Sequence, residues 1–204
     1  MIPVPRLYPI VDTASFSTTE DLVRYAEQLL AAGCRLLQYR NKTGNARVML
    51  KHARELKGHV GATARLIMND RADLALVAEF DGVHVGQDDL LPDSVRAIIG
   101  PDRWLGVSTH NPEQIEEADR TSADYLAIGP VFSTSSKDKP DPVVGLEGVR
   151  RARLLTRKPL VAIGGITRAN AASVIEAGAD SVAVISDLLR EPGKSAEEFF
   201  RILR

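Results

Sequence analysis

The chain has 204 residues, 44% of them hydrophobic and 26% charged, which fits a single globular domain with one core. Its net charge of −1 argues against nucleic acid or an anionic membrane as the main partner, because both attract a clear basic excess. A single cysteine, the lack of a basic leader and the lack of an apolar run near the roughly 20 residues that span a bilayer together lead us to expect a cytoplasmic protein.

Short β-branched runs alternate with amphipathic stretches along the whole chain. The stretch over 19–32, for example, places Leu22, Tyr25 and Leu29 on one helical face. In chain order, strands are predicted at residues 7–11, 35–39, 65–68, 82–85, 104–107, 125–128, 160–163 and 181–185. Helices are predicted near residues 19–32, 45–57, 71–79, 92–99, 111–119, 146–155, 168–177 and 195–203.

A weak internal repeat supports this alternation. Segments 79–86, 122–129 and 177–184 share one design, in which a helix ends, an acidic residue turns the chain and a short apolar strand follows. Strand–helix units with short connections predict a parallel sheet closed into a (β/α)8 TIM barrel. An open doubly wound sheet is the alternative, but no insertion that would change the topology interrupts the units. We expect residues 1–204 to form a single minimal barrel domain.

Polar residues at the C-terminal ends of the strands are the candidate site, because barrel enzymes place their chemistry there. Residues 38–42 close the second strand, and a period of two puts Gln38, Arg40 and Lys42 on one face. A guanidinium binds phosphate oxygens in bidentate fashion, and an ammonium adds a mobile charge. The trio therefore favours a polyanion with a hydrogen-bonding ring, although a solvated strand end would carry the same residue types.

Acidic residues follow the next two strands. Asn69 and Asp70 end the third strand, and Asp88 and Asp89 follow the fourth. Either pair could simply start a helix, with Asp70 as the N-cap. Close to Arg40, however, carboxylates from adjacent strand ends suit Mg2+, which takes one or two carboxylates together with water and substrate phosphates. Which of Asp88 and Asp89 would face the metal stays open.

Hydroxyl-bearing residues follow the fifth and sixth strands. Ser108 could donate to a phosphate oxygen, and the role of His110 is left open. Residues 129–142 form the longest polar connection, and their length predicts a lid that excludes water. The hydroxyls and the lysine of this connection that favour an anion are Thr134, Ser135, Ser136 and Lys137.

The loops after strands seven and eight are the usual phosphate site of this fold. Gly165 lies in the first of these loops, and glycines let backbone N–H groups approach a phosphate. Ile185 and Ser186 follow the eighth strand. A second ligand that carries a monophosphate is therefore expected. The chain contains neither the glycine pattern of dinucleotide-binding proteins nor that of a P-loop.

In their order and spacing, these segments resemble the thiamine-phosphate synthase family over essentially the whole chain. The matching segments are residues 38–42, 69–70, 83–89, 106–108, 129–137, 163–166 and 185–186. The resemblance implies a transferase that joins 4-amino-5-hydroxymethyl-2-methylpyrimidine diphosphate to 4-methyl-5-(2-phosphoethyl)thiazole. The products would be thiamine phosphate and diphosphate, formed by a dissociative, magnesium-assisted substitution.

The resemblance also assigns roles to residues. The pyrimidine diphosphate would contact Gln38, Arg40, Lys42, Asn69, Ser108 and Lys137. Of these, the groups that stabilise the leaving diphosphate would be Arg40, Lys42, Lys137 and Ser108. Mg2+ would be held by Asp70 and Asp89. The thiazole phosphate would be surrounded by Thr134, Ser135, Ser136, Gly165, Ile185 and Ser186.

Two alternatives stay beside this reading. A thiazole tautomerase-like isomerase of the same fold would act on the thiazole phosphate alone, and His110 keeps it in view as a candidate base. A non-catalytic sensor of phosphate ligands on a degenerate barrel would lose the metal carboxylates, which this chain keeps. The expected partners are small molecules, with no nucleic acid and no membrane, and the oligomeric state stays open.

Overall fold

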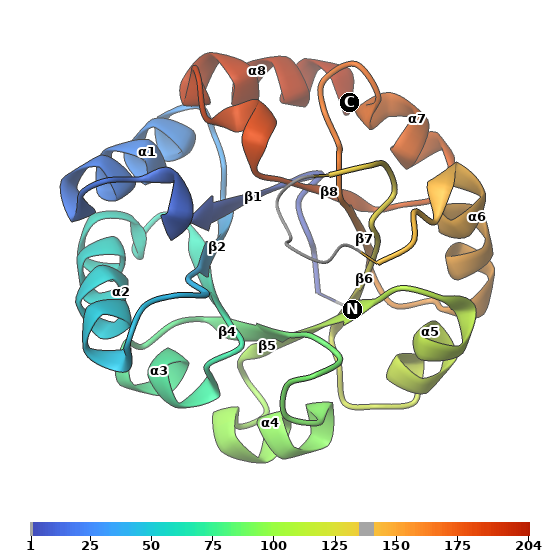
Figure 1. Cartoon of the computed structure of the whole chain (residues 1–204), viewed down its shortest axis with the longest axis horizontal. Coiled ribbons are helices and arrows are strands. Elements are labelled where there is room, and N and C mark those ends of the chain that lie inside the picture. Colours follow the sequence, from blue (N-terminus) through green and yellow to red (C-terminus); the bar gives the residue numbers. More distant parts are fainter. Residues whose placement is uncertain (1, 135–140) are drawn as a thin grey trace.

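The computed structural model describes residues 2–134 and 141–204, which form a closed barrel of parallel strands inside a ring of helices (Figure 1). Each strand pairs with the next along the chain, and β1 pairs with β8, so the open doubly wound alternative is wrong. The predicted (β/α)8 barrel is confirmed. Its strands are β1 Leu7–Asp12, β2 Leu36–Arg40, β3 Arg65–Asn69, β4 Gly82–Val85, β5 Trp104–Thr109, β6 Tyr125–Ile128, β7 Leu160–Ile163 and β8 Ser181–Val184.

A helix follows each strand in the described part of the chain. The helices are α1 Thr19–Ala31, α2 Ala46–Val60, α3 Ala72–Val77, α4 Pro92–Ile99, α5 Pro112–Asp119, α6 Gly145–Leu155, α7 Ala171–Glu176 and α8 Pro192–Ile202, with short 3-10 helices η1 Thr13–Ser15 and η2 Ser186–Leu188. Side-chain oxygens of Thr18, Asn45 and Asn111 cap α1, α2 and α5 by accepting backbone N–H bonds. None of these described helices is long and apolar enough to cross a membrane.

Several boundaries differ from the sequence prediction where polar residues take part in the structure. β1 continues to Asp12 and β2 to Arg40, because these two residues pair in register across the strands. The predicted helix over 168–177 starts only at Ala171. Before it, the Asn170 side chain accepts a hydrogen bond from the backbone N–H of Thr167. This bond closes a turn, so residues 168–170 do not join the helix.

The side chains of the strands alternate between two cores. Those that point inward fill the barrel, and Tyr8, Ile67 and Trp104 belong to this inner cluster. Those that point outward, such as Leu37 and Tyr39, join the larger cluster between strands and helices. The N-terminal segment, faint blue in Figure 1, packs apolar side chains against the inner cluster at the far end of the barrel. The inner space is thus filled at one end and open at the other.

The repeated acidic residue has a structural role at the N-terminal ends of the strands. Asp81 accepts from the backbone N–H of Leu66, and Asp124 and Asp180 make the same contact, at 2.8 Å, with Leu105 and Leu160. Each carboxylate thereby links the start of one strand to the start of the strand before it. The repeat found in the sequence therefore marks stability, and it lies at the end of the barrel opposite the candidate site.

Candidate active site

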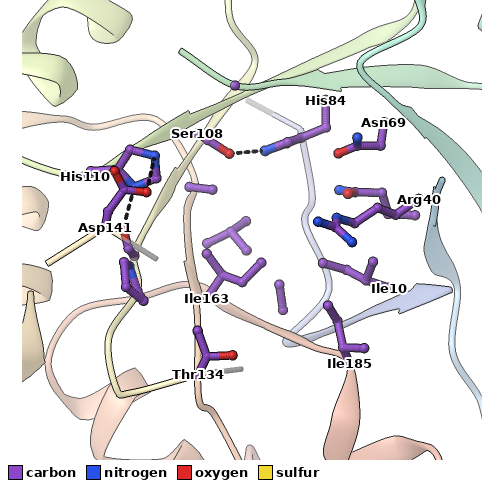
Figure 2. A pocket seen from close by; sticks show the side chains of 18 of the residues that line it. Ile10, Arg40, Asn69, His84, Ser108, His110, Thr134, Asp141, Ile163 and Ile185 are labelled. Carbon is purple, nitrogen blue, oxygen red and sulfur yellow. Dashed lines mark hydrogen bonds and ion pairs between the residues drawn. The ribbon is translucent and has the colours of Figure 1, made fainter. Parts of the chain in front are cut away.

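A cavity of about 480 Å³ opens at the C-terminal ends of the strands. Figure 2 shows Arg40 and Asn69 on one wall and His110 and Asp141 on the opposite one. Every described residue that the sequence predicts for the site lines this cavity: Gln38, Arg40, Lys42, Asn69, Asp70, Asp89, Ser108, Thr134, Gly165, Ile185 and Ser186. The remaining three, Ser135, Ser136 and Lys137, lie outside the described residues.

The end of β2 supplies the cationic wall. Gln38, Arg40 and Lys42 point into the cavity, and Tyr39 between them packs into the outer core, as the period of two predicts. Arg40 Nη1 donates to a carboxylate oxygen of Asp12, which is its register partner on β1. Sequence analysis missed Asp12, because a lone acid at a strand end carries no signal until the barrel brings the two strands together.

Asp70 and Asp89 lie side by side at the ends of β3 and β4. Burial raises the pKa of Asp70; the Lys42 ammonium, 2.6 Å from its Oδ2, opposes that shift, and the Asp89 carboxylate adds to it. Asp89 is held in place by the backbone N–H of Gly86, which donates to its Oδ2 at 2.7 Å. Asp88 is exposed. Asp88 lines the same cavity, but Asp89 is the carboxylate that interacts with Asp70.

The alternative in which Asp70 caps a helix is wrong. Its backbone lies in the left-handed region, with a φ of 64°, where aspartate is better tolerated than most side chains. The N-cap of α3 is Arg71, which makes no side-chain capping bond. The left-handed turn instead places Asp70 among the residues that line the cavity.

The two carboxylates fit a hard divalent cation. They are oxygen donors, and their mutual repulsion, which contributes to the raised pKa of Asp70, is what a cation between them would relieve. No group of three or more histidine, cysteine or acidic side chains suited to a metal occurs within residues 2–134 and 141–204. Mg2+ is usually held by one or two carboxylates and takes its other ligands from water and substrate.

A continuous run of hydrogen bonds joins five side chains beneath the cavity, and we call it the Gln38–Ser108 chain. Gln38 Nε2 donates to the Tyr8 hydroxyl at 3.1 Å, and the hydroxyls of Tyr8 and Tyr125 are 3.1 Å apart. His84 Nδ1 lies 3.0 Å from the Tyr125 hydroxyl, and its Nε2 lies 2.8 Å from Ser108 Oγ (Figure 2). Burial lowers the pKa of His84 to about 4, so its ring is neutral near neutral pH.

Sequence analysis missed both tyrosines of this chain. Tyr8 and Tyr125 lie inside predicted strands and have the composition of ordinary core residues. The sequence holds one usable signal, because both fall on the inward face by the period of two. A buried hydroxyl on that face needs a hydrogen-bond partner. His84 lies on the same inward face and lines the cavity.

Asn69 ends β3 beside this chain. The residue is 7% exposed and its side chain points into the cavity (Figure 2). Its Nδ2 has no hydrogen-bond partner among the described residues. A buried amide donor without a partner costs free energy, so this atom favours a ligand that brings an acceptor.

The loops after β7 and β8 form a second wall. Gly165 has a φ of 63°, and a Cβ there would lie 2.5 Å from the carbonyl oxygen of Ser133, so only glycine fits. Arg168 ties the two loops together, because its backbone N–H and its Nε both donate to Asp187, at 2.8 and 3.0 Å, and it also pairs with Glu198. Sequence analysis missed Arg168, whose partners are far apart in the chain.

His110 connects β5 to the loop after β6. Its Nδ1 donates to the carbonyl oxygen of Gly129 at 2.6 Å, and its Nε2 lies 3.4 Å from a carboxylate oxygen of Asp141 (Figure 2). The contact with Asp141 is an ion pair only when the ring is protonated. The bond to Gly129 ties the end of β5 to the loop after β6 and fixes the orientation of the ring at the cavity wall.

Comparison with known proteins agrees with this geometry. The sequence profile of the thiamine monophosphate synthase family matches residues 7–188. The thiamine-phosphate synthase of Koribacter versatilis is 58% identical over 203 residues, covering 98% of this chain and 96% of the relative, and that of Chloroflexus aurantiacus is 43% identical over 182 residues, covering 89% and 83%. The solved thiamine phosphate pyrophosphorylase of Pyrococcus furiosus is 32% identical, covers 97% of this chain and 95% of its own, and superposes with a TM-score of 0.86.

Proposed function

Because the chain belongs to the thiamine monophosphate synthase family, we propose that it is a thiamine-phosphate synthase. Its reaction joins 4-amino-5-hydroxymethyl-2-methylpyrimidine diphosphate to 4-methyl-5-(2-phosphoethyl)thiazole and yields thiamine phosphate and diphosphate. The observation that carries the proposal is the charge pattern of the cavity, where two carboxylates and two cations meet at three adjacent strand ends. A metal–diphosphate has the complementary pattern.

In this reaction the protein has to stabilise the diphosphate as it leaves. The aminopyrimidine ring releases electrons toward its methylene carbon, so the C–O bond to the diphosphate breaks and its electron pair leaves on the diphosphate oxygen. The thiazole nitrogen then gives its lone pair to the same carbon and forms the new C–N bond. That nitrogen carries no proton, so no general base is needed. The residues contribute electrostatic stabilisation and close positioning.

In this mechanism cations and donors from several strand ends bind the diphosphate. Arg40 and Lys42 carry the positive charge, Lys137, which lies outside the described residues, would add a third cation, and Ser108 donates to a phosphate oxygen. The anchoring of Arg40 by Asp12 supports this role, because it fixes the guanidinium at the cavity wall before substrate arrives.

The pyrimidine ring lies against Gln38 and Asn69 in the same proposal. Both side chains are buried amides at the cavity, and the unpartnered Nδ2 of Asn69 is suited to an acceptor on the ring or on the diphosphate. An amide can both donate and accept, which matches the amino group and ring nitrogens of an aminopyrimidine.

Asp70 and Asp89 would hold Mg2+. A bound divalent ion supplies charge neutralisation for the diphosphate as it departs. Two features support this assignment: the carboxylates are adjacent, and burial together with Asp89 raises the pKa of Asp70, so the pair favours a cation. Lys42 pairs with Asp70 at 2.6 Å, which places its ammonium at the same strand ends as the two carboxylates.

The thiazole phosphate occupies the second wall. It would be bound by Thr134, Ser135, Ser136, Gly165, Ile185 and Ser186, partly through backbone N–H groups. The left-handed backbone at Gly165 and the tie that Arg168 makes to Asp187 support this placement, because both shape the loops after β7 and β8. One barrel domain, residues 1–204, carries the whole activity in this proposal, and the single buried cysteine suits the reducing cytoplasm.

A mixed assay tests the function. The purified protein, given both substrates and Mg2+, should release diphosphate and form thiamine phosphate in equal amounts. Without the thiazole phosphate, it should release no diphosphate. Isomerisation of the thiazole phosphate without diphosphate release would instead identify a tautomerase-like isomerase. Binding of either phosphate without any turnover would identify a sensor. Either of those two results overturns the proposal.

A further inference from the structure

The hydrogen bonds of the Gln38–Ser108 chain all donate in the same direction, from Gln38 toward Ser108. This follows because each hydroxyl in the chain has a single hydrogen to donate. The Tyr8 hydroxyl accepts from Gln38 Nε2, and the acceptor that the described residues offer to its own hydrogen is the Tyr125 hydroxyl. The Tyr125 hydroxyl in turn gives its hydrogen to His84 Nδ1. Burial raises the pKa of both phenols well above the ordinary value, so each keeps that hydrogen. The order of donation is thus the same at every step.

The same order of donation continues from the His84 imidazole to Ser108. Because Nδ1 accepts from the Tyr125 hydroxyl, it carries no hydrogen, so the N–H of the ring is on Nε2. Nε2 therefore donates to Ser108 Oγ at 2.8 Å. Ser108 lines the cavity, and its own hydrogen is left for an acceptor there. The chain converts a hydroxyl that could donate or accept into one that donates to the ligand.

A hydrogen bond to Ser108 and the small size of Gly106 help to hold Ser108 and His84 in this arrangement. Gln87 Nε2 donates to the carbonyl oxygen of Ser108 at 2.6 Å, so the backbone of this residue is fixed as well as its side chain. Gly106 leaves the space that the chain occupies, since a Cβ there would lie 2.1 Å from Cζ of Tyr125 and 2.4 Å from Nδ1 of His84. The tyrosine and histidine rings fill a volume that only glycine in this strand leaves open.

We propose that His84 is a positioning residue that turns the hydroxyl hydrogen of Ser108 toward the leaving diphosphate, and that Tyr8 and Tyr125 fix this direction. The inference rests on the proposed function, because an oxygen of the diphosphate is the acceptor. A hydrogen set in place before the reaction stabilises developing negative charge without reorganising in the transition state. Its loss should therefore lower kcat more than it raises KM.

The tautomer of His84 is the first test, and it needs no substrate. Long-range 1H–15N correlation spectra of the folded protein labelled with 15N-histidine, with the His84→Gln spectrum as the assignment control, report which nitrogen carries the hydrogen. The chain requires a protonated Nε2 and an unprotonated Nδ1. Tyr125→Phe should convert this single form into a mixture of tautomers. A wild-type His84 protonated on Nδ1 overturns the proposal.

Kinetics of the same variants form the second test. Tyr125→Phe should lower kcat about tenfold with little change in KM, which corresponds to the loss of one oriented hydrogen bond. At position 84, glutamine reaches the place of Nε2 and asparagine only that of Nδ1, so His84→Gln should keep more activity than His84→Asn. Equal kcat for wild type, Tyr125→Phe and both His84 variants would contradict the positioning role.

Tyr39→Phe is the matched control. Tyr39 is also a buried tyrosine of a strand, and its hydroxyl bonds to His52 and Asn41, but it faces the outer core. Loss of the Tyr39 hydroxyl should lower stability as Tyr125→Phe does and leave kcat unchanged. An equal fall of kcat in both variants would show a purely structural effect and overturn the proposal. If wild type forms no thiamine phosphate, the proposed function fails, while the tautomer test still decides the direction of the chain.

Discussion

Two ionisable residues of the cavity have pKa values shifted toward their neutral forms. Burial raises the pKa of Asp70 and lowers that of His84 to about 4. For His84, neutrality serves the direction of the hydrogen-bond chain. For Asp70, the raised pKa means that its negative charge is unfavourable in these surroundings, and a bound metal cation would stabilise that charge. The same low-dielectric surroundings therefore serve hydrogen bonding at one residue and cation binding at the other.

Asp70→Asn should separate stability from activity. The substitution removes a carboxylate whose charge is disfavoured by burial and by Asp89, and asparagine accepts the left-handed backbone at this position. In metal-free buffer the melting temperature should rise, while kcat/KM with Mg2+ should fall about 100-fold or more. Asp73→Asn is the control, because Arg71 lowers the pKa of Asp73 and its loss should not stabilise the fold. A variant with lower melting temperature and full activity would count against the account.

His84 should make the protein sensitive to acid. Its folded pKa of about 4 lies below the ordinary 6.5, so the unfolded chain binds the proton first as pH falls. The stability that His84 contributes is complete above pH 6.5 and is lost progressively as pH falls toward 4, a total of about 3 kcal/mol. Urea unfolding of wild type and His84→Gln across this range measures it. Parallel pH curves for the two proteins would show that His84 does not titrate as described.

At the level of elements, the barrel divides its polar residues between two ends. At the N-terminal end, Arg96 of α4 donates to the carbonyl oxygens of Gly100, Arg103 and Ser122 and to the Asp124 carboxylate at 2.6 Å. One side chain thereby joins a helix end, a strand start and the following loop. At the C-terminal end the polar side chains face the cavity. Stability and chemistry are thus carried by opposite ends of the same strands.

Arg96→Met should destabilise the fold without altering the site. The methionine keeps the apolar stem but removes one donor from the Asp124 carboxylate and one from each of three carbonyl oxygens, so the free energy of unfolding should fall by about 2–4 kcal/mol. At temperatures where the variant is folded, kcat should match wild type. Arg120→Ala, which removes an exposed pair with Glu116, should change stability by less than about 1 kcal/mol. A similar loss in both variants would argue against the role of Arg96.

The sequence predicts elements better than it predicts pairings between them. Strand periodicity placed Gln38 and Arg40 inward because the alternation of side chains is a local property of the backbone. The partnership of Arg40 with Asp12 and the tyrosines of the Gln38–Ser108 chain depend on which strands become neighbours and in what register. Arg168 depends on the same closure, since its partners Asp187 and Glu198 come from later elements. Such pairs have no signal in the linear sequence until the barrel order is known.

The whole molecule is a closed barrel with a charged cavity at the C-terminal ends of its strands. Removing divalent metal with excess EDTA should abolish turnover, because the two carboxylates then repel the diphosphate instead of binding it through a cation. Added Mg2+ should restore activity, and circular dichroism should show an unchanged fold throughout. Full turnover that persists in EDTA would remove the metal from the mechanism.

The most direct test of the central claim is a crystal structure with diphosphate and Mn2+, whose anomalous scattering locates the metal. The account predicts the ion at the carboxylates of Asp70 and Asp89, with the diphosphate between it and Arg40. The hydroxyl of Ser108 should then lie within hydrogen-bond distance of a diphosphate oxygen. A metal–diphosphate bound elsewhere, or a diphosphate in the cavity without contact to these carboxylates, would contradict it.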